Sequence, residues 1–366
     1  MQFHEQEAGP KASSLATSIR QRLYTFARRL ARPFTDSRRR RFLTDLVTGL
    51  VIAGHVHLTK IARALTRGLG NTHADEKRLS KHLGSEPWDA RPLADELRRR
   101  SAALATPQTL LVADTTDLAK YYARHLEGLG RVHDGSDPEK RSAPGYALFE
   151  AYVRVGRWQL FPLCAELLKP YAGVPTSENA EIERHLLACH EALGRQGTWV
   201  LDRGFDRRNL FGPLVQHGVA FVARQVGGRH VRTADGRTVA VGALADELRP
   251  RPWPRPWPRG GHAVAVPVYL PEVSDQEFLL VVSWRYPDSA PPLLLLVSPA
   301  ARGRGRTARW FAKAYRRRWG VADATRGVKQ PFAVASFLVR SWRSIQRLLG
   351  LVAWAFWWLN RWGEPG

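Results

Sequence analysis

The sequence predicts an α+β fold, in which a mixed sheet is interrupted by a β-rich segment and flanked by helical regions. Residues 15–104 and 306–361 show the apolar spacing of helices, whereas residues 107–225 alternate β-like runs with helical ones. With 366 residues and 44% hydrophobic content, the chain is long enough for two or three domains. We therefore expect a folded protein rather than a basic disordered tail.

The N-terminal region combines helical periodicity with clustered positive charge. We expect residues 1–14 to be disordered and residues 15–104 to form a helical DNA-binding region. The apolar residues of LTKIARAL fall on one helix face, namely Leu58, Ile61, Ala62 and Leu65. A glycine-containing turn, GLGN, and a second charged helix follow, an order compatible with helix-turn-helix DNA binding. An ordinary helical bundle with a solvated basic face is the alternative.

The central region, residues 105–225, reads as a sheet with intervening helices. The runs QTLLVADTTD, YALFEAYVRVG, WQLFPLCAEL, TWVLDRGFD and VAFVARQV are β-like, and the second and third form a hairpin that turns at Gly156. A polar helical segment covers 176–193. The first and fourth runs place an acid, Asp114 or Asp202, where we expect the strand to stop.

The remainder divides into three parts. Residues 226–300 read as a β-rich insertion, residues 301–345 as a return to the central core through a helix, and residues 346–366 as a C-terminal helix. The insertion contains RPRPWPRPWPRGG at 249–261, which is neither helix nor inner strand because proline lacks the backbone donor. We read this tract as an extended loop that either touches a DNA backbone or acts as a rigid spacer.

The charge of the chain indicates a polyanionic partner. A formal net charge of +23 on a globular chain is typical of nucleic-acid binding, with an anionic membrane surface as the weaker alternative. The two cysteines exclude a disulfide framework or a zinc ribbon. The N-terminus has no apolar signal region, and the apolar run at 348–359 is too short to cross a bilayer. We therefore expect double-stranded DNA as partner, no membrane and a cytoplasmic location.

Asp114 and Asp202 are the candidate metal ligands. In α/β folds, ligands collect at the carboxyl ends of strands, and two carboxylates brought together there raise each other's pKa. A divalent cation relieves that repulsion, and hard oxygen ligands suit Mg²⁺ or Mn²⁺. Each aspartate alone is weak evidence, because an acid that closes a strand is more often a turn or cap residue.

The predicted helix at 306–329 strengthens this interpretation. At 100° per residue, one stripe about 60° wide contains Tyr315, Arg318, Ala322 and Lys329, and Arg326 lies beside it. The stripe joins an aromatic ring and three cations around an alanine. A solvated basic helix does not account for that arrangement.

Together these motifs resemble those of the bacterial cut-and-paste insertion-sequence transposases of the DDE class. Their mark is Y-x2-R-x3-E-x6-K on a helix of an RNase H-like core, and this chain has Tyr315, Arg318, Ala322 and Lys329 at that spacing. LLVADTTD and WVLDRGFD are similar to the segments that carry the first two acids, Asp114 and Asp202. The resemblance covers roughly residues 107–345; the N-terminal third is matched only in character.

The resemblance implies a specific chemistry. Such an enzyme binds the terminal inverted repeats of its element as a homodimer, cleaves both ends and transfers the 3′-hydroxyls into target DNA, with two Mg²⁺ or Mn²⁺ ions. Asp114 and Asp202 would share one ion, and the family's glutamate would help hold the other. Tyr315, Arg318 and Lys329 would hold end phosphates, with Arg326 on the same DNA-binding face. The location implied is the bacterial nucleoid.

The departure from the family is Ala322, which stands where the resemblance expects the catalytic glutamate. Either a deliberate substitution disables cleavage and traps a DNA complex, or natural decay has left a domesticated, non-enzymatic DNA-binding protein such as a repressor. Asp323 lies about 100° around the helix and replaces the glutamate only if the helix breaks near Gly320. We therefore expect a transposase that is catalytically disabled in this form.

Overall fold

The computed structural model divides into two compact units, Met1–Ala94 with Val328–Gly366 and Asp95–Gly327. The structure describes residues 10–66, 70–85, 88–123, 125–133, 141–156, 159–168, 177–253, 261–286, 291–303, 305–318 and 332–362. The boundaries that we predicted from sequence remain predictions. The C-terminal helix belongs to the same compact unit as the N-terminal helices, a pairing that no local pattern indicates.

The first unit is helical. Its elements are α1 (Pro10–Leu30), α2 (Ser37–Ala53), α3 (Leu58–Thr66), α4 (Thr72–Gly84), the 3₁₀ turn η3 (Val334–Ser336) and α11 (Trp342–Trp362), while α5 (Arg91–Ala102) spans the boundary between the units. Helix α1 begins inside the segment that we expected to be disordered, because proline is well suited to the first helical position.

Helices α2 and α3 pack closely. Gly49 makes this approach possible, since a Cβ there would lie 2.5 Å from Cγ2 of Ile61. Leu58, Ile61 and Ala62 are buried, as the helix face read from the sequence predicts. No single helix within the described ranges is long and apolar enough to cross a membrane; α2 and α3 satisfy that test only as a pair, with a bend of 94° between them.

Arg347 anchors α11 within this unit. The side chain is buried and donates hydrogen bonds to the backbone carbonyls of Leu83, Ser85 and Trp88, at 2.7, 2.9 and 2.5 Å. The guanidinium also lies 4.3 Å from the centroid of the Trp88 ring. These contacts satisfy a charge that would otherwise be costly to bury.

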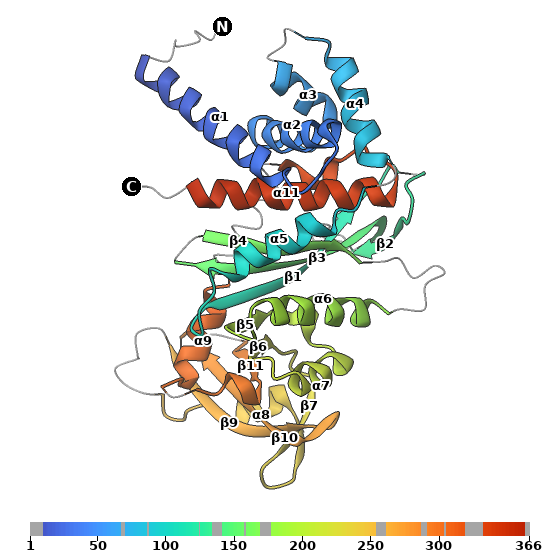
Figure 1. The fold of residues 1–366 in the computed structure, drawn as a ribbon. Helices are drawn as coiled ribbons and strands as arrows, with labels where there is room; N and C mark the ends of the chain where they lie inside the picture. Colours follow the sequence, from blue (N-terminus) through green and yellow to red (C-terminus); the bar gives the residue numbers. More distant parts are fainter. Residues whose placement is uncertain are drawn as a thin grey trace, which may run out of the picture. The chain divides into compact units, whose positions relative to one another are not determined.

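The second unit is built on an eleven-stranded mixed sheet (Figure 1). Its strands are β1 (Leu110–Ala119), β2 (Gly130–His133), β3 (Ser142–Val155), β4 (Gln159–Leu167), β5 (Thr198–Leu201), β6 (Phe221–Arg224), β7 (His230–Thr233), β8 (Thr238–Ala240), β9 (His262–Leu270), β10 (Val273–Trp284) and β11 (Leu293–Val297). Its helices are α6 (Glu178–Ala192), α7 (Arg208–Gln216), α8 (Val241–Glu247) and α9 (Ala308–Arg316), with 3₁₀ turns η1 (Arg203–Phe205) and η2 (Pro299–Ala301).

The strand order is β2-β3-β1-β5-β6-β11-β10-β9-β7-β8, and β4 also pairs with β3. Strand β5 is parallel to both β1 and β6, whereas β1 with β3 and β3 with β4 are antiparallel. The predicted mixed α+β class is therefore correct. The predicted β-rich insertion continues this same sheet, because β11 pairs directly with β6.

Three local predictions were wrong. Strand β1 does not stop at Asp114 but continues to Ala119, because its antiparallel pairing with β3 continues to Gly145. The run RTVAVGAL at 237–244, which we read from the sequence as β-like, is a strand only up to Ala240 and continues as helix α8 from Val241. The helix predicted at 306–329 is not continuous, since α9 ends at Arg316 and the next two residues form a turn.

Candidate functional site

Asp114 and Asp202 lie at the same level on neighbouring parallel strands. The pairing of β1 with β5 ends at Val112↔Val200, and each aspartate follows two residues later. Because side chains alternate along a strand, Asp114 faces the same side of the sheet as Val112, and Asp202 the same side as Val200. Two residues far apart in sequence thus converge on one face of the sheet.

Arg318 contacts both carboxylates. Its Nη2 lies 3.2 Å from Oδ1 of Asp114 and 3.3 Å from Oδ2 of Asp202. The two carboxylate oxygens are therefore at most ~6.5 Å apart, the sum of those distances. All three side chains are largely buried, with 14% of Arg318, 20% of Asp114 and 29% of Asp202 exposed. The guanidinium offsets the repulsion between the two acids.

Asp202 is further fixed by the turn that follows β5. It is the N-cap of η1, where Oδ1 accepts a hydrogen bond from the backbone N–H of Gly204 at 2.8 Å. A Cβ at Gly204 would lie 3.0 Å from that same oxygen, so the close approach favours glycine. One oxygen of Asp202 therefore contacts the backbone and the other contacts Arg318.

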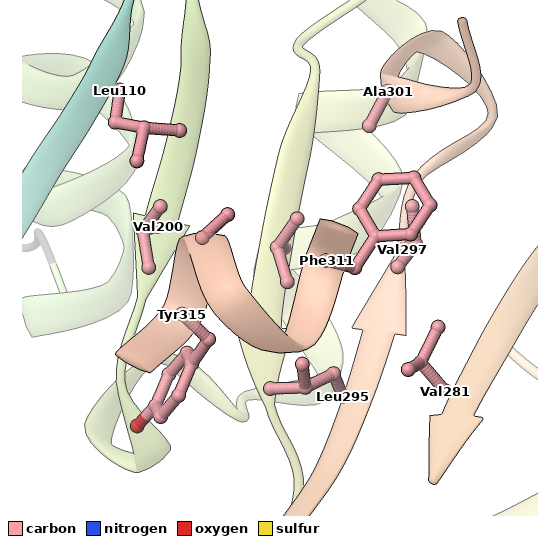
Figure 2. Packing of buried hydrophobic residues seen from close by; sticks show 10 residues of the cluster. Leu110, Val200, Val281, Leu295, Val297, Ala301, Phe311 and Tyr315 are labelled. Atoms are coloured by element: carbon pink, nitrogen blue, oxygen red, sulfur yellow. The ribbon is translucent and has the colours of Figure 1, made fainter. Parts of the chain in front are cut away.

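Helix α9 determines where Arg318 lies. Its apolar face, with Phe311, Ala314 and Tyr315, packs on a buried cluster contributed by several strands (Figure 2). The cluster comprises Leu110, Val200, Val222, Val281, Leu295, Val297 and Ala301 together with those three helix residues. After the helix ends, the N–H of Arg318 donates to the carbonyl of Tyr315 at 2.9 Å, and this turn places Arg318 beside the acids.

Tyr315 is part of this core. Its exposed fraction is 1%, and it belongs to the buried cluster drawn in Figure 2. Burial raises the pKa of Tyr315, and the charge of Asp202 adds to that rise, while Arg318 and Arg224 oppose it. The Tyr315 hydroxyl therefore lies within the electrostatic influence of one acid and two cations. The ring packs α9 onto the sheet, and contact of Tyr315 with DNA stays a prediction.

Sequence reasoning missed Glu150, which lies directly across from Asp114 in the β1–β3 pairing. Its side chain is buried, with Oε1 accepting a hydrogen bond from the Tyr152 hydroxyl at 2.7 Å and Oε2 one from the Thr116 hydroxyl at 3.2 Å. Burial raises the pKa of Tyr152 strongly, and the charges of Glu150 and Asp114 add to the effect, so the phenol stays protonated and donates. An acid inside the apolar run YALFEAYV was the available signal.

The rest of the predicted motif lies outside the described residues. Ala322, Arg326 and Lys329 all fall within 319–331, so their predicted roles stay predictions, as does the helical stripe beyond Arg318. Most of the proline-rich tract, residues 254–260, is also outside the described ranges.

The described ranges contain no group of three or more His, Cys, Asp or Glu side chains arranged to hold a metal ion. Asp114 and Asp202 make a two-carboxylate set. Asp206, which follows Asp202 closely, has a structural role. It accepts from the backbone N–H of Val226 at 2.9 Å and pairs with Arg229 at 2.5 Å.

The pair His185 and Cys189 is also structural. From the sequence ERHLLACH we read Cys189 as a core thiol and His185 as a surface residue, rather than as zinc ligands. His185 is instead buried and stacks on Phe149, because α6 turns this side chain onto the sheet. Cys189 lies 3.4 Å, sulfur to sulfur, from Cys164 on β4, and both thiols are free and buried. This supports the interpretation of Cys189 as a core thiol.

Comparisons with known proteins give a similarity in structure but none in sequence. No protein-family profile matches the chain, and no curated protein matches it either. Among solved structures, the chain is similar to the cryo-EM structure of a piggyBac transposase synaptic complex with hairpin DNA. The TM-score is 0.48 at 12% sequence identity, covering 93% of this chain and 73% of that one. We therefore infer the function of this chain from its own residues.

Proposed function

We propose that this chain is a DNA transposase of the DDE class, whose active parent cleaves both ends of its element and transfers the 3′-hydroxyls to target DNA. The single observation that carries the proposal is the contact of Arg318 with both Asp114 and Asp202. Three residues that the transposase motif singles out, from positions 114, 202 and 318, meet at one point. A chance resemblance of short motifs gives no reason for such a meeting.

The topology of the second unit supports an RNase H-like core. Strands β1, β3 and β4 form an antiparallel set, and β5 and β6 continue the sheet in parallel on the other side of β1. The first acid lies on the central strand of this arrangement and the second at the end of its parallel neighbour. Helix α9 then returns across the same face with the motif residues at its end.

The two aspartates fit a divalent ion. Their oxygens lie within ~6.5 Å on well-anchored elements, and the Arg318 guanidinium shows that the space between them accepts positive charge. Hard carboxylate ligands suit Mg²⁺ or Mn²⁺, and the second ion of the parent enzyme would need the acid replaced by Ala322. When bound, such ions would stabilise charge on the attacking and leaving oxygens of the phosphodiester.

Arg318 is the residue that we assign to a DNA phosphate. Its Nη2 contacts the acids, and 14% of the side chain is exposed beside them. A guanidinium has five N–H donors in a planar fork that matches phosphate geometry, so Arg318 has donors to offer a DNA end. Arg326 and Lys329 belong to the same proposed DNA-binding face. Two ends held together imply a homodimer on DNA.

The test restores the missing acid. Ala322→Glu should produce nicking at the terminal repeats that flank the element in Mg²⁺ or Mn²⁺, while the present chain should bind those ends without cutting. The readout is cleavage of an end-labelled duplex by the two proteins side by side. Asp114→Asn in the Ala322→Glu background is the matched control and should abolish the new activity.

Three other outcomes have definite meanings. Equal cutting by both proteins would show that position 322 is not catalytic. If the Ala322→Glu protein still cut DNA after Asp114→Asn, the aspartates would not be part of the catalytic site. Specific end binding without cutting by either protein would favour the alternative, a domesticated non-enzymatic DNA-binding protein such as a repressor.

A further inference from the structure

An arginine-lined groove lies between α1 and α2 in the helical unit. The hollow has a volume of about 590 Å³, and its lining includes Arg28, Arg29, Arg32, Arg40 and Arg41 beside Tyr24. One acid, Asp45, is also in the lining. The arginines come from the end of one helix and the start of the next, so the fold gathers them on one concave surface.

The acids near this groove do not neutralise it. Asp45 is held by Nη2 of Arg78 at 2.8 Å, and the same nitrogen contacts Asp75 at 2.9 Å. Arg41 approaches Asp45 only at 3.7 Å. Among the described residues, no carboxylate lies within 4.0 Å of the guanidinium groups of Arg29, Arg32 or Arg40. A concave surface of one charge sign concentrates the electrostatic field and attracts anions.

The position of these cations on α2 also indicates an external anion. The run Ser37–Arg41 begins α2, and the one acid at this helix end is the N-cap Asp36, whose Oδ1 accepts a hydrogen bond from the N–H of Arg38 at 2.9 Å. The N-terminus of a helix carries partial positive charge, so cations there are unfavourable and anions favourable. Helix stability therefore does not explain four successive arginines, whereas binding a polyanion does.

The groove has the length of a polymer site. A second hollow of about 430 Å³ shares Tyr24, Arg41 and Asp45 with the first and continues along α2 to Ile52. It adds Arg20 and the ion pair of Arg78 with Asp75. From Ser37 to Ile52, α2 rises roughly 22 Å at 1.5 Å per residue. That length matches about six phosphates of one DNA strand at 3.4 Å each.

We propose that this α1–α2 groove binds the phosphate backbone of duplex DNA. The proposal rests on the proposed function for its choice of DNA as the partner, but it concerns a surface separate from the aspartate site. It also differs from the helix-turn-helix reading of the sequence, which placed the contact on α3 and α4. Arginine side chains from α1 and α2 contact the DNA phosphates, and such contacts do not depend on the base sequence.

The test compares two double variants that each remove two positive charges from the helical unit. Arg32→Ala/Arg40→Ala removes groove arginines, and the control Arg22→Ala/Arg361→Ala removes exposed arginines outside it. Affinity for a 30-base-pair duplex is measured by fluorescence anisotropy from 50 to 200 mM salt, and circular dichroism checks helix content. Each lost phosphate contact lowers the salt slope by about 0.9, so the groove variant should lose about 1.8 and the control close to none.

The other outcomes overturn the proposal in distinguishable ways. Equal losses in both variants would mean that binding is spread over the unit, and no loss in the groove variant would place the contact elsewhere; both results leave the proposed function intact. A larger loss from Arg63→Ala on α3 would favour the helix-turn-helix surface. Binding to phosphatidylserine vesicles without binding to duplex DNA would overturn this proposal and the proposed function together.

Discussion

Glu150 on β3 and Asp114 on β1 lie directly opposite each other in the antiparallel pairing of their strands. Opposed residues in such a pair have Cβ atoms about 4.5–5.5 Å apart, so two carboxylates share one small region of the sheet. Asp114 is balanced by Arg318, whereas Glu150 is held by the hydroxyls of Tyr152 and Thr116. Glu150, which we did not predict from the sequence, is therefore a direct neighbour of Asp114, which we did.

Replacing Glu150 should destabilise the second unit. In Glu150→Ala the buried hydroxyls of Tyr152 and Thr116 lose their acceptor, which should reduce the free energy of unfolding by about 2–4 kcal/mol. Glu150→Gln keeps one acceptor and should cost less. Urea denaturation followed by circular dichroism measures the difference. A loss below about 0.5 kcal/mol in the alanine variant would mean that this network does not support the fold.

Removing Arg318 should strengthen metal binding at the aspartates. The guanidinium competes with any cation for Asp114 and Asp202, so Arg318→Ala should bind Mn²⁺ at least about tenfold more tightly, because an uncompensated pair of acids favours a cation. Titration calorimetry with Mn²⁺ measures the affinity. Arg318→Ala/Asp202→Asn should lose the gain, and a gain that persists would place the ion elsewhere.

Tyr315 should behave as a core residue. Tyr315→Ala leaves a cavity between α9 and the sheet and should lower the free energy of unfolding by about 3–5 kcal/mol, as buried aromatic truncations do. Tyr315→Phe keeps the ring and should cost less than about 1.5 kcal/mol. Thermal or urea unfolding distinguishes them. If the two variants were equally unstable, the hydroxyl rather than the ring would be the stabilising group.

Lys120 should titrate near neutral pH. Burial lowers the pKa of Lys120 from 10.5 to about 8. At pH 8 the amine is therefore neutral in roughly half of the molecules, whereas an ordinary lysine is neutral in less than about 1% of them. Amine acetylation at several pH values, read by mass spectrometry, should label Lys120 first. Lys81, an exposed lysine in the first unit, is the internal reference.

The same shift links Lys120 to stability with a definite sign. Between pH 8 and 10.5 the unfolded chain binds more protons than the folded one, so the free energy of unfolding of the native protein rises across that window. Lys120→Met lacks this dependence. The difference in free energy of unfolding between Lys120→Met and the native protein should therefore decrease as pH rises from about 8 to about 10.5. A difference that increases over this range would contradict the lowered pKa of Lys120.

Sequence reasoning identified the acids because their signal is local. LLVAD and WVLD are apolar runs that end in an acid, and the parallel pairing of β1 with β5 brings Asp114 and Asp202 to one level. The end of β1 could not be read in the same way, since what extends it past Asp114 is its partner β3 rather than its own composition. Strand length here depends on tertiary pairing, which overrides local propensity.

The end of α9 and the placement of α11 show the same limit. The residues after Tyr315 carry good helix formers, but the helix closes at Arg316 with a turn that directs Arg318 toward the acids. The apolar run at 348–359 was correctly read as a buried helix. The residues against which this helix packs could not be predicted, because the backbone carbonyls that accept hydrogen bonds from Arg347 are more than 250 positions away in the chain.

The pairing of β11 with β6 has a consequence for how the protein is made. During synthesis β6 emerges with one edge open, and the strand that covers it follows about 70 residues later. At roughly 5–20 residues per second, a ribosome needs about 4–14 s to supply it. Throughout that interval the nascent chain exposes an unpaired apolar edge, a template for association with other chains. Chaperone protection of this intermediate is thus most valuable before Val297 has left the ribosome.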